Sequence, residues 1–184
     1  MHAVIDNFSR RILAWTVRES FDTGVTAVML REAAKGLTDT RPNAVMDRGI
    51  ENINASVTEL IESGIIKRVL AQVDVTYSNS MIESWWRALK HQWLFLHYLD
   101  TIETVRRLVT FYVEQHNTHV PHYAFNGQTP DEMFFGTGTD VPEQLRIATL
   151  NARKSRREVN LQVTCSRCRT EPPMVPISTP TNST

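Results

Sequence analysis

Two carboxylate side chains occupy positions at which an α/β protein commonly does its chemistry. Asp47 directly follows residues 43–46, a predicted buried strand, and Gly49 allows the backbone to turn sharply after it. Glu83 lies in the first turn of a predicted long helix. Ligands of open α/β sheets gather at the carboxyl ends of strands, and hard divalent cations prefer carboxylate oxygens. The pair is therefore a candidate metal site, although the helix dipole alone also favours an acidic residue at position 83.

Two cationic side chains share a helix face with Glu83. Arg87 and Lys90 follow it by four and seven residues, and these spacings place side chains on one face of an α-helix. A carboxylate for a metal ion beside two cations for a phosphodiester backbone suits phosphoryl transfer on nucleic acid. A solvated helix face with an ion pair between Glu83 and Arg87 is the alternative.

A second group of cations lies near the carboxyl end of the chain. Residues 140–170 hold seven basic side chains against three acidic ones, a net charge of about +4, whereas the whole chain has 20 of each and a net charge of zero. The whole-chain balance by itself predicts neither a nucleic-acid-binding protein nor one with an acidic partner. The candidate DNA contacts in the basic segment are Arg153, Lys154, Arg156 and Arg157. An ordinary solvated helix is the alternative.

The elements that must position these residues alternate between strand and helix patterns, which predicts an α/β sheet. The predicted elements are a hairpin of residues 3–5 and 11–17, a helix from Val25 to Gly36, a strand at 43–46, a helix at 53–63, a strand at 65–70, a long helix from Ser80, a helix at 101–116, a helix start at Thr129–Pro130 and a basic helix at 142–160. On the helix from Ser80, steps of four and three predict a buried stripe of Ile82, Trp86, Leu89, Trp93 and Leu96. The pair Trp85 and Trp86 is predicted to belong to the core rather than to stack on bases.

Several ordered motifs resemble the catalytic core of insertion-sequence transposases and retroviral-type integrases. The segments "MDRGIEN" and "NSMIESWWRALKHQW" are similar to the second and third acidic motifs of that family, with 35 residues, positions 48 to 82, between Asp47 and Glu83. The segment "VIDNFSRRILAW" resembles the second and third strands of the family, and "FYVEQHNTHVPHYAFNGQTPDEMFFG" resembles its closing segment. Together these motifs cover about residues 1–136, and their order is more specific than any one of them.

The resemblance implies a ribonuclease H-like fold, in which a mixed sheet is flanked by helices. It implies metal-dependent phosphoryl transfer, in which two Mg²⁺ or Mn²⁺ ions held by an Asp-Asp-Glu set activate water for strand cleavage and a 3′ hydroxyl for joining. Asp47 and Glu83 would be two of those three carboxylates, catalytic and metal-ligating. Arg87 and Lys90 match family positions associated with contact to DNA ends. The implied partners are transposon-end and target DNA, together with a second copy or an intact transposase.

One departure from the family pattern concerns the first catalytic aspartate. In the family it belongs to the strand before "VIDNFSR", whereas this sequence starts at Met1 just inside the following strand. Asp6 matches a hairpin residue of the family and is not a substitute. In the chain as given we therefore expect a sheet that lacks its first, central strand and consists of two half-sheets with open edges, and an incomplete catalytic set. Either translation begins upstream and supplies that strand, or the chain is a truncated remnant. An inactive remnant that binds DNA, or that dimerises with an intact transposase and interferes with it, is the rival interpretation; an unrelated α/β domain with incidental spacing is a third.

The sequence also predicts how the chain is divided. Residues 1–138 are expected to form the catalytic core, 139–169 a basic helical extension, and 170–184 a disordered tail rich in proline, serine and threonine. No apolar run is long enough to cross a membrane and no signal peptide is evident, so a cytoplasmic protein is expected.

Two smaller groups of possible metal ligands are predicted to be something else. Cys165 and Cys168 are half of a zinc-ribbon pattern, but tetrahedral zinc needs two further ligands and none follow. His116, His119 and His122 are spaced three apart and imitate a metal cluster. Because that segment spans a helix end and a loop with Pro121, structural roles are predicted for the three histidines.

Overall fold

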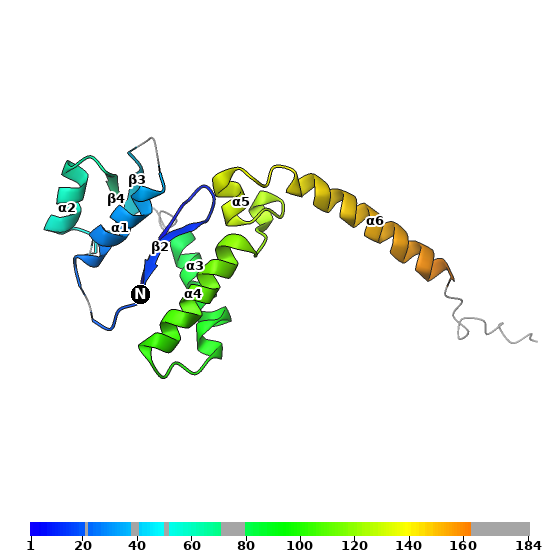
Figure 1. Cartoon of the computed structure of the whole chain (residues 1–184), viewed down its shortest axis with the longest axis horizontal. Helices are drawn as coiled ribbons and strands as arrows, with labels where there is room; N and C mark the ends of the chain where they lie inside the picture. The colour runs from blue at the N-terminus through cyan, green and yellow to red at the C-terminus, as the bar shows by residue number, and fades with distance from the viewer. Residues whose placement is uncertain (21, 38–40, 50–51, 71–79, 163–184) are drawn as a thin grey trace, which may run out of the picture. The chain divides into compact units, whose positions relative to one another are not determined.

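The computed structural model describes residues 1–20, 22–37, 41–49, 52–70 and 80–162. The chain divides into two units, residues Met1–Pro142 and Glu143–Thr184 (Figure 1). The elements in chain order are β1 (His2–Ile5), β2 (Ile12–Thr16), α1 (Val25–Lys35), β3 (Asn43–Met46), α2 (Ala55–Glu62), β4 (Lys67–Leu70), α3 (Ser80–Gln92), η1 (Leu94–Leu96), α4 (Ile102–Thr118), η2 (Tyr123–Phe125), α5 (Pro130–Phe135) and α6 (Val141–Gln162). The predicted order of strands and helices is confirmed over these residues, with ends that shift by a few positions.

The described strands form two separate two-stranded sheets rather than one mixed sheet. β1 and β2 pair antiparallel, from His2 opposite Thr16 to Ile5 opposite Ile12, with one irregularity after Val4. β3 and β4 pair parallel, from Asn43 opposite Lys67 to Met46 opposite Leu70. Both strand orientations are present, but no described strand lies between β1 and β3 to join the two ladders. Each sheet therefore keeps two open edges within the described part of the chain.

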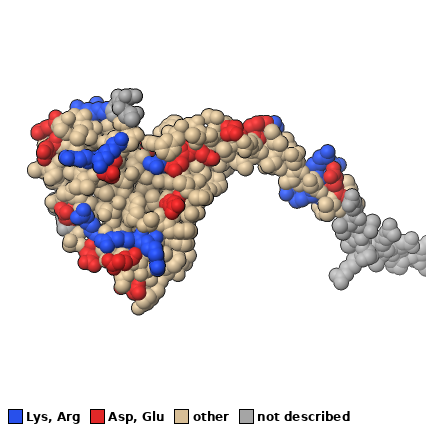
Figure 2. Space-filling model, viewed as in Figure 1, with Lys and Arg blue, Asp and Glu red and all other residues tan. Residues whose placement is uncertain are grey.

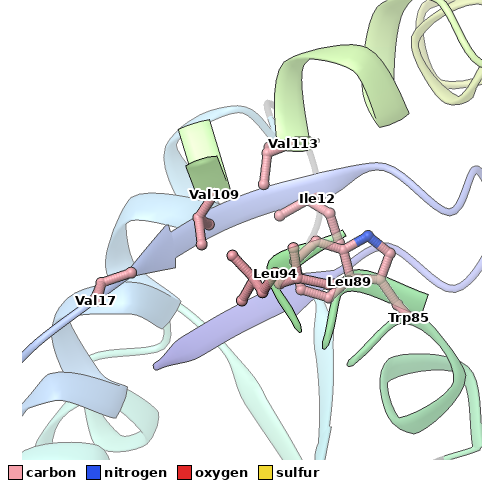
Figure 3. Packing of buried hydrophobic residues seen from close by; sticks show 7 residues of the cluster. All are labelled: Ile12, Val17, Trp85, Leu89, Leu94, Val109 and Val113. Atoms are coloured by element: carbon pink, nitrogen blue, oxygen red, sulfur yellow. The ribbon is translucent and has the colours of Figure 1, made fainter. Parts of the chain in front are cut away.

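The larger core cluster is built around α3. Its buried members come from the hairpin, α3, η1 and α4, as Figure 3 shows: Ile12, Val17, Trp85, Leu89, Leu94, Val109 and Val113. The predicted stripe on α3 was partly wrong. Trp85 is buried, with 5% of its surface exposed, whereas Trp86 packs against the cluster and is only partly buried, and Leu96 is 73% exposed. The α-helix ends at Gln92 and a 3₁₀ turn follows, so the helical spacing no longer applies at position 96.

Helix α1 supplies the apolar face that covers the other side of β1. Its residues Met29 and Ala33 pack with Ala14 of β2, and Val4 of β1 joins that cluster. Leu30 of the same helix packs in a second cluster with residues of β3, α2 and the start of β4. Val4 points to α1, whereas its neighbours Ala3 and Ile5 pack against the α3 cluster. Because side chains alternate along a strand, α1 and α3 cover opposite faces of β1.

The carboxyl-terminal part of the described chain is helical. Thr129 caps α5 through a capping box with Glu132, and Pro130 is the first helical residue, as predicted. The predicted basic helix is α6, whose residues from Glu143 to Leu161 are exposed. No helix of the described residues is long and apolar enough to cross a membrane. The predicted tail 170–184 and the pair Cys165 and Cys168 lie outside the described residues.

Candidate functional site

Helix α3 has a buried face and, on its opposite side, a charged face. Trp85 and Leu89 fix the helix to the core, with 5% and 0% of their surfaces exposed. On the other side Glu83 and Arg87 are exposed and Lys90 is half-buried. The Lys90 ammonium group lies 5.9 Å from the centroid of the Trp86 ring, close enough for a cation–π contact. Because α3 packs against the core through Trp85 and Leu89, Glu83 and Arg87 on its other side are exposed to solvent.

The ion pair between Glu83 and Arg87, which belongs to the alternative interpretation of this face, is not formed. Four of the ion pairs found among the described residues join neighbours three or four positions apart on other segments, and the fifth joins Arg11 to Asp131. Glu83 and Arg87 are both described and do not approach within ion-pair distance. Both side chains are exposed, as on a solvated helix face, but they do not pair with each other.

Asp47 is held in a turn at the carboxyl end of β3. Its Oδ1 atom accepts hydrogen bonds from the backbone N–H of Gly49, at 2.8 Å, and from the side-chain amide of Asn52, at 2.7 Å. Aspartate commonly makes such a bond to the backbone two residues on, which reverses the chain. The side chain is exposed. Asn52 was not singled out from the sequence, yet it holds this carboxylate; an amide five residues after an aspartate in a turn is a weak signal.

A cavity of about 410 Å³ lies beside Asp47. Asp47 and Asn52 line it, and so do Met81, Ile82 and Trp86 of α3. The end of β3 and the first turns of α3 thus line one cavity. Glu83 is not among the residues that line the cavity. Over the described ranges, no group of three or more His, Cys, Asp or Glu side chains could hold a metal ion. As they stand, Asp47 and Glu83 do not complete a site for a resident ion.

The segment that closes the first unit is held to the hairpin by polar contacts. Asn117 of α4 accepts a hydrogen bond from the N–H of Ile12, at 2.9 Å, and donates one to the carbonyl of Ile12, at 3.0 Å. Arg11 forms an ion pair with Asp131 of α5 at 2.6 Å. The role of Asn117 was missed from the sequence. The sequence does carry a signal for it: Asn117 follows the apolar Val113 by four residues, so the two side chains lie on the same, inner face of α4.

The three histidines have separate structural contacts, as predicted. The Nε2 atom of His116 lies 2.8 Å from the carbonyl oxygen of Arg10 and must carry a proton, because a carbonyl only accepts. His119 contacts the hydroxyl of Thr118, and His122 accepts from the N–H of Ala124 at the start of η2. Their different partners explain their spacing without a metal.

We expect protonation of His116 to destabilise the fold. Burial lowers the pKa of His116 from its ordinary value near 6.5; the bond to the Arg10 carbonyl and the charge of Asp131 oppose this shift, and the neighbouring His122 adds to it. The unfolded chain therefore binds the proton more readily, so the free energy of unfolding should be greatest above pH 6.5 and should fall as the pH drops below it. Urea titrations at pH 7.5 and 5.5 measure this loss.

The variant His116→Gln should lose part of this pH dependence, while His119→Gln, which changes an exposed histidine on the same segment, should keep it. An equal pH dependence in all three proteins would contradict the assignment to His116.

The basic residues of α6 form a cationic surface on the second unit. Arg153, Lys154, Arg156 and Arg157 are exposed and fall within roughly half of the helix circumference. Figure 2 shows their charges towards the carboxyl end of the helix. Unlike these four residues, Arg146 donates two hydrogen bonds to Glu143 on the same helix. These bonds lower the pKa of the Glu143 carboxyl group. The basic residues beyond position 162 lie outside the described residues.

One family model matches part of the chain. Residues 66–130 match the family model described as an integrase core domain. The match contains Glu83, Arg87 and Lys90 and the closing segment as far as Pro130, with Asn117; Asp47 lies outside it. No curated protein matches the chain. The family match confirms the resemblance to an integrase or transposase catalytic core over this segment and supports a function in DNA integration or transposition. Integrase core domains generally depend on a divalent metal and act on DNA.

Proposed function

We propose that this chain binds DNA as the core of a transposase or integrase, through the charged face of α3. The observation that carries the proposal is the position of Glu83, Arg87 and Lys90 on one accessible face of a helix whose other face is buried, inside the segment that matches an integrase core domain. Two cations on one face can neutralise neighbouring phosphates of a DNA strand. Transposon ends and target DNA are the proposed ligands.

Asp47 and Glu83 are the carboxylates that we propose for Mg²⁺ or Mn²⁺. When bound, the ion would supply a Lewis acid for phosphoryl transfer. Asp47 is oriented at the end of β3 by two hydrogen bonds, from the N–H of Gly49 and the side chain of Asn52. Both bonds go to its Oδ1 atom and neither goes to Oδ2. The described residues supply no third ligand, so these two side chains do not fit a resident ion by themselves.

A DNA-binding or interfering module without strand-joining activity is the second candidate function. The incomplete set of ligands around Asp47 favours it, because a hard cation demands several oxygen ligands. In this case the cations of α3 and α6 would still bind DNA, and the protein would act alone or with a second copy or an intact transposase. Mg²⁺-dependent joining of DNA strands by the purified protein would overturn this candidate and favour the first.

The double variant Arg87→Ala with Lys90→Ala tests the DNA-binding proposal. Each phosphate contact contributes about one unit to the slope of log affinity against log salt concentration, so the double variant should lower the slope by roughly two. The measurement is fluorescence anisotropy of a labelled DNA duplex at a series of salt concentrations. Changing Arg153, Lys154, Arg156 and Arg157 together to alanine should lower the slope further.

A matched control removes two cations from another helix. Arg31 and Lys35 are exposed on α1, and their replacement by alanine removes the same charge from the chain. The control variant should keep the wild-type slope, and circular dichroism should show that all variants are folded. Equal slopes for the α3 variant and the wild type, or binding that does not depend on salt, would contradict a phosphate-binding role of the α3 face.

A further inference from the structure

Arg10, at the tip of the β1–β2 hairpin, has a charged side chain without an acceptor. None of the ion pairs found among the described residues includes it. Its Nη1 atom is buried and has no hydrogen-bond partner there, although the residue as a whole is only partly buried. A buried donor of a charged group costs free energy as long as it lacks an acceptor. Arg10 is therefore a candidate for binding an anion.

His122 is a second hydrogen-bond donor close to Arg10. Its Nδ1 atom accepts a hydrogen bond from the backbone N–H of Ala124 at 3.3 Å, so in the neutral ring the proton lies on Nε2. That N–H group has no acceptor among the hydrogen bonds found for the described residues. Burial and, after it, the positive charge of Arg10 lower the pKa of His122 from its ordinary value near 6.5. The two groups therefore lie close enough for their charges to repel each other.

The fold holds both donors in place where the hairpin meets the closing segment. The Nε2–H group of His116, near the end of α4, donates to the carbonyl oxygen of Arg10 at 2.8 Å. The next hairpin residue, Arg11, pairs with Asp131 of α5 at 2.6 Å. His122 lies in the chain between these two contact points. The site is therefore preorganised, which lowers the cost of binding a ligand there.

The acidic side chains of the hairpin turn and of α5 already have partners. Asp6 accepts hydrogen bonds from the N–H and the hydroxyl of Ser9, at 2.8 and 2.5 Å. The two acidic residues of α5 are engaged in the ion pair with Arg11 and in the capping box. Residues 115–130 contain no Asp or Glu. An external anion is thus the acceptor that fits Arg10.

We propose that Arg10 and His122 form a binding site for inorganic phosphate or a phosphate monoester at the tip of the hairpin. The planar guanidinium group donates two parallel hydrogen bonds to phosphate oxygens, and the Nε2–H group of His122 donates a third. Near neutral pH such a phosphate carries up to two negative charges, which match two cationic groups better than the single charge of a carboxylate does. A guanidinium group drawn towards the anion also gains the acceptor that Nη1 lacks. The site is separate from the charged face of α3 and does not depend on the proposed function.

The backbone conformation of Arg10 offers a variant that removes only its side chain. Its φ angle of 65° is in the left-handed region, which glycine adopts without strain, and Arg10→Gly keeps the carbonyl bonded to His116. Phosphate binding is followed by NMR through the imidazole signals of the six histidines, at constant ionic strength and near-neutral pH. The signal of His122 should shift saturably. Arg10→Gly should raise the dissociation constant of phosphate about tenfold or more.

Two further readouts separate binding from a structural role. Arg10→Lys keeps the charge but not the fork of two donors, so it should bind phosphate more weakly than the wild type and more tightly than Arg10→Gly. The pKa of His122 should rise when phosphate binds, because the anion favours the protonated ring. In Arg10→Gly this pKa should already be higher without phosphate, since the charge of Arg10 is gone, and phosphate should not change it.

Two DNA duplexes identify the source of the phosphate. They share one sequence, and one carries a 5′-phosphate where the other has a 5′-hydroxyl. Displacement of inorganic phosphate by the first duplex alone supports a DNA end as the ligand, and displacement by neither supports free phosphate; the site stands in both cases. Arg87→Ala with Lys90→Ala should leave phosphate binding unchanged. A failure of the α3 face in DNA binding is therefore distinguishable from a failure of this site.

The variants His122→Asn and His119→Gln are a matched pair. In His122→Asn the new side chain can still accept the bond from Ala124 but lacks the outer N–H group, so phosphate binding should weaken about fivefold. His119→Gln changes an exposed neighbour and should bind as the wild type does. If a variant does not fold by circular dichroism, the titration of the wild type decides. A His122 signal that does not move up to about 50 mM phosphate, or equal dissociation constants for the wild type and Arg10→Gly, would overturn the proposal.

Discussion

Replacing Trp85 with alanine is expected to lower the free energy of unfolding by about 4 kcal/mol. The side chain is 5% exposed and lies at the centre of the cluster that joins α3 to the hairpin and α4. Its ring makes edge contacts with Trp86, Tyr112 and His116, with centroids 4.9, 6.0 and 6.1 Å away. Alanine would remove these contacts and leave a cavity that the packed helices can fill only in part. Urea denaturation followed by circular dichroism measures the loss.

The variant Trp85→Phe is the matched control for this prediction. The indole N–H of Trp85 is buried and has no hydrogen-bond partner in the described structure. Phenylalanine keeps an aromatic ring in the cluster and removes that unpaired donor, so we expect a loss of no more than about 1.5 kcal/mol. Similar losses for the two variants would show that the ring packing of residue 85 is not what holds α3.

The Trp85 variants also connect the core to the proposed function. Glu83, Arg87 and Lys90 lie on α3, and that helix is positioned by Trp85 and Leu89. In the folded Trp85→Phe protein the salt dependence of DNA binding should equal that of the wild type. Since Trp85 is buried, a role in base stacking is excluded for it in this conformation.

Local sequence signals were enough to predict most elements of this fold. The Thr129–Pro130–Asp131–Glu132 run predicted a capped helix, and the structure shows the capping box there. The predicted strand at residues 43–46 and the predicted helix from Ser80 were confirmed at their first residues. These predictions succeeded because caps, turns and short apolar runs depend on neighbours in the sequence.

Features that depend on distant residues could not be predicted from the same signals. Both tryptophans were predicted to belong to the core, but the predicted stripe included Trp86 and not Trp85. Trp85 is the more deeply buried of the two, because Ile12 and Tyr112, which are distant in the sequence, pack around it. The predicted pairing of Asp47 with Glu83 stays a prediction, because Asp47 shares its cavity with Met81, Ile82 and Trp86 of α3 and not with Glu83. The motif spacing could not predict Asn52 as the partner of Asp47, because a side-chain bond in a turn depends on the backbone path.

Asn117→Ala should also cause a large loss of stability, by a different mechanism. Asn117 is 7% exposed and its side-chain amide makes both hydrogen bonds to the backbone of Ile12, so it acts like a neighbouring strand at the outer edge of β2. Alanine would leave one buried donor and one buried acceptor of Ile12 without partners. Each unsatisfied group costs about 1–3 kcal/mol, and we expect a total loss of about 3 kcal/mol.

The control for this variant is Thr110→Ala, on the exposed side of the same helix α4, which should change the free energy of unfolding by less than about 0.5 kcal/mol. Hydrogen exchange separates the proposed mechanism from a general loss of packing. In Asn117→Ala the backbone amide of Ile12 should lose more protection against exchange than the amides that are hydrogen-bonded between β1 and β2. A uniform change across the hairpin would show that Asn117 stabilises the core by filling space, and that the open edge of β2 does not need a polar partner.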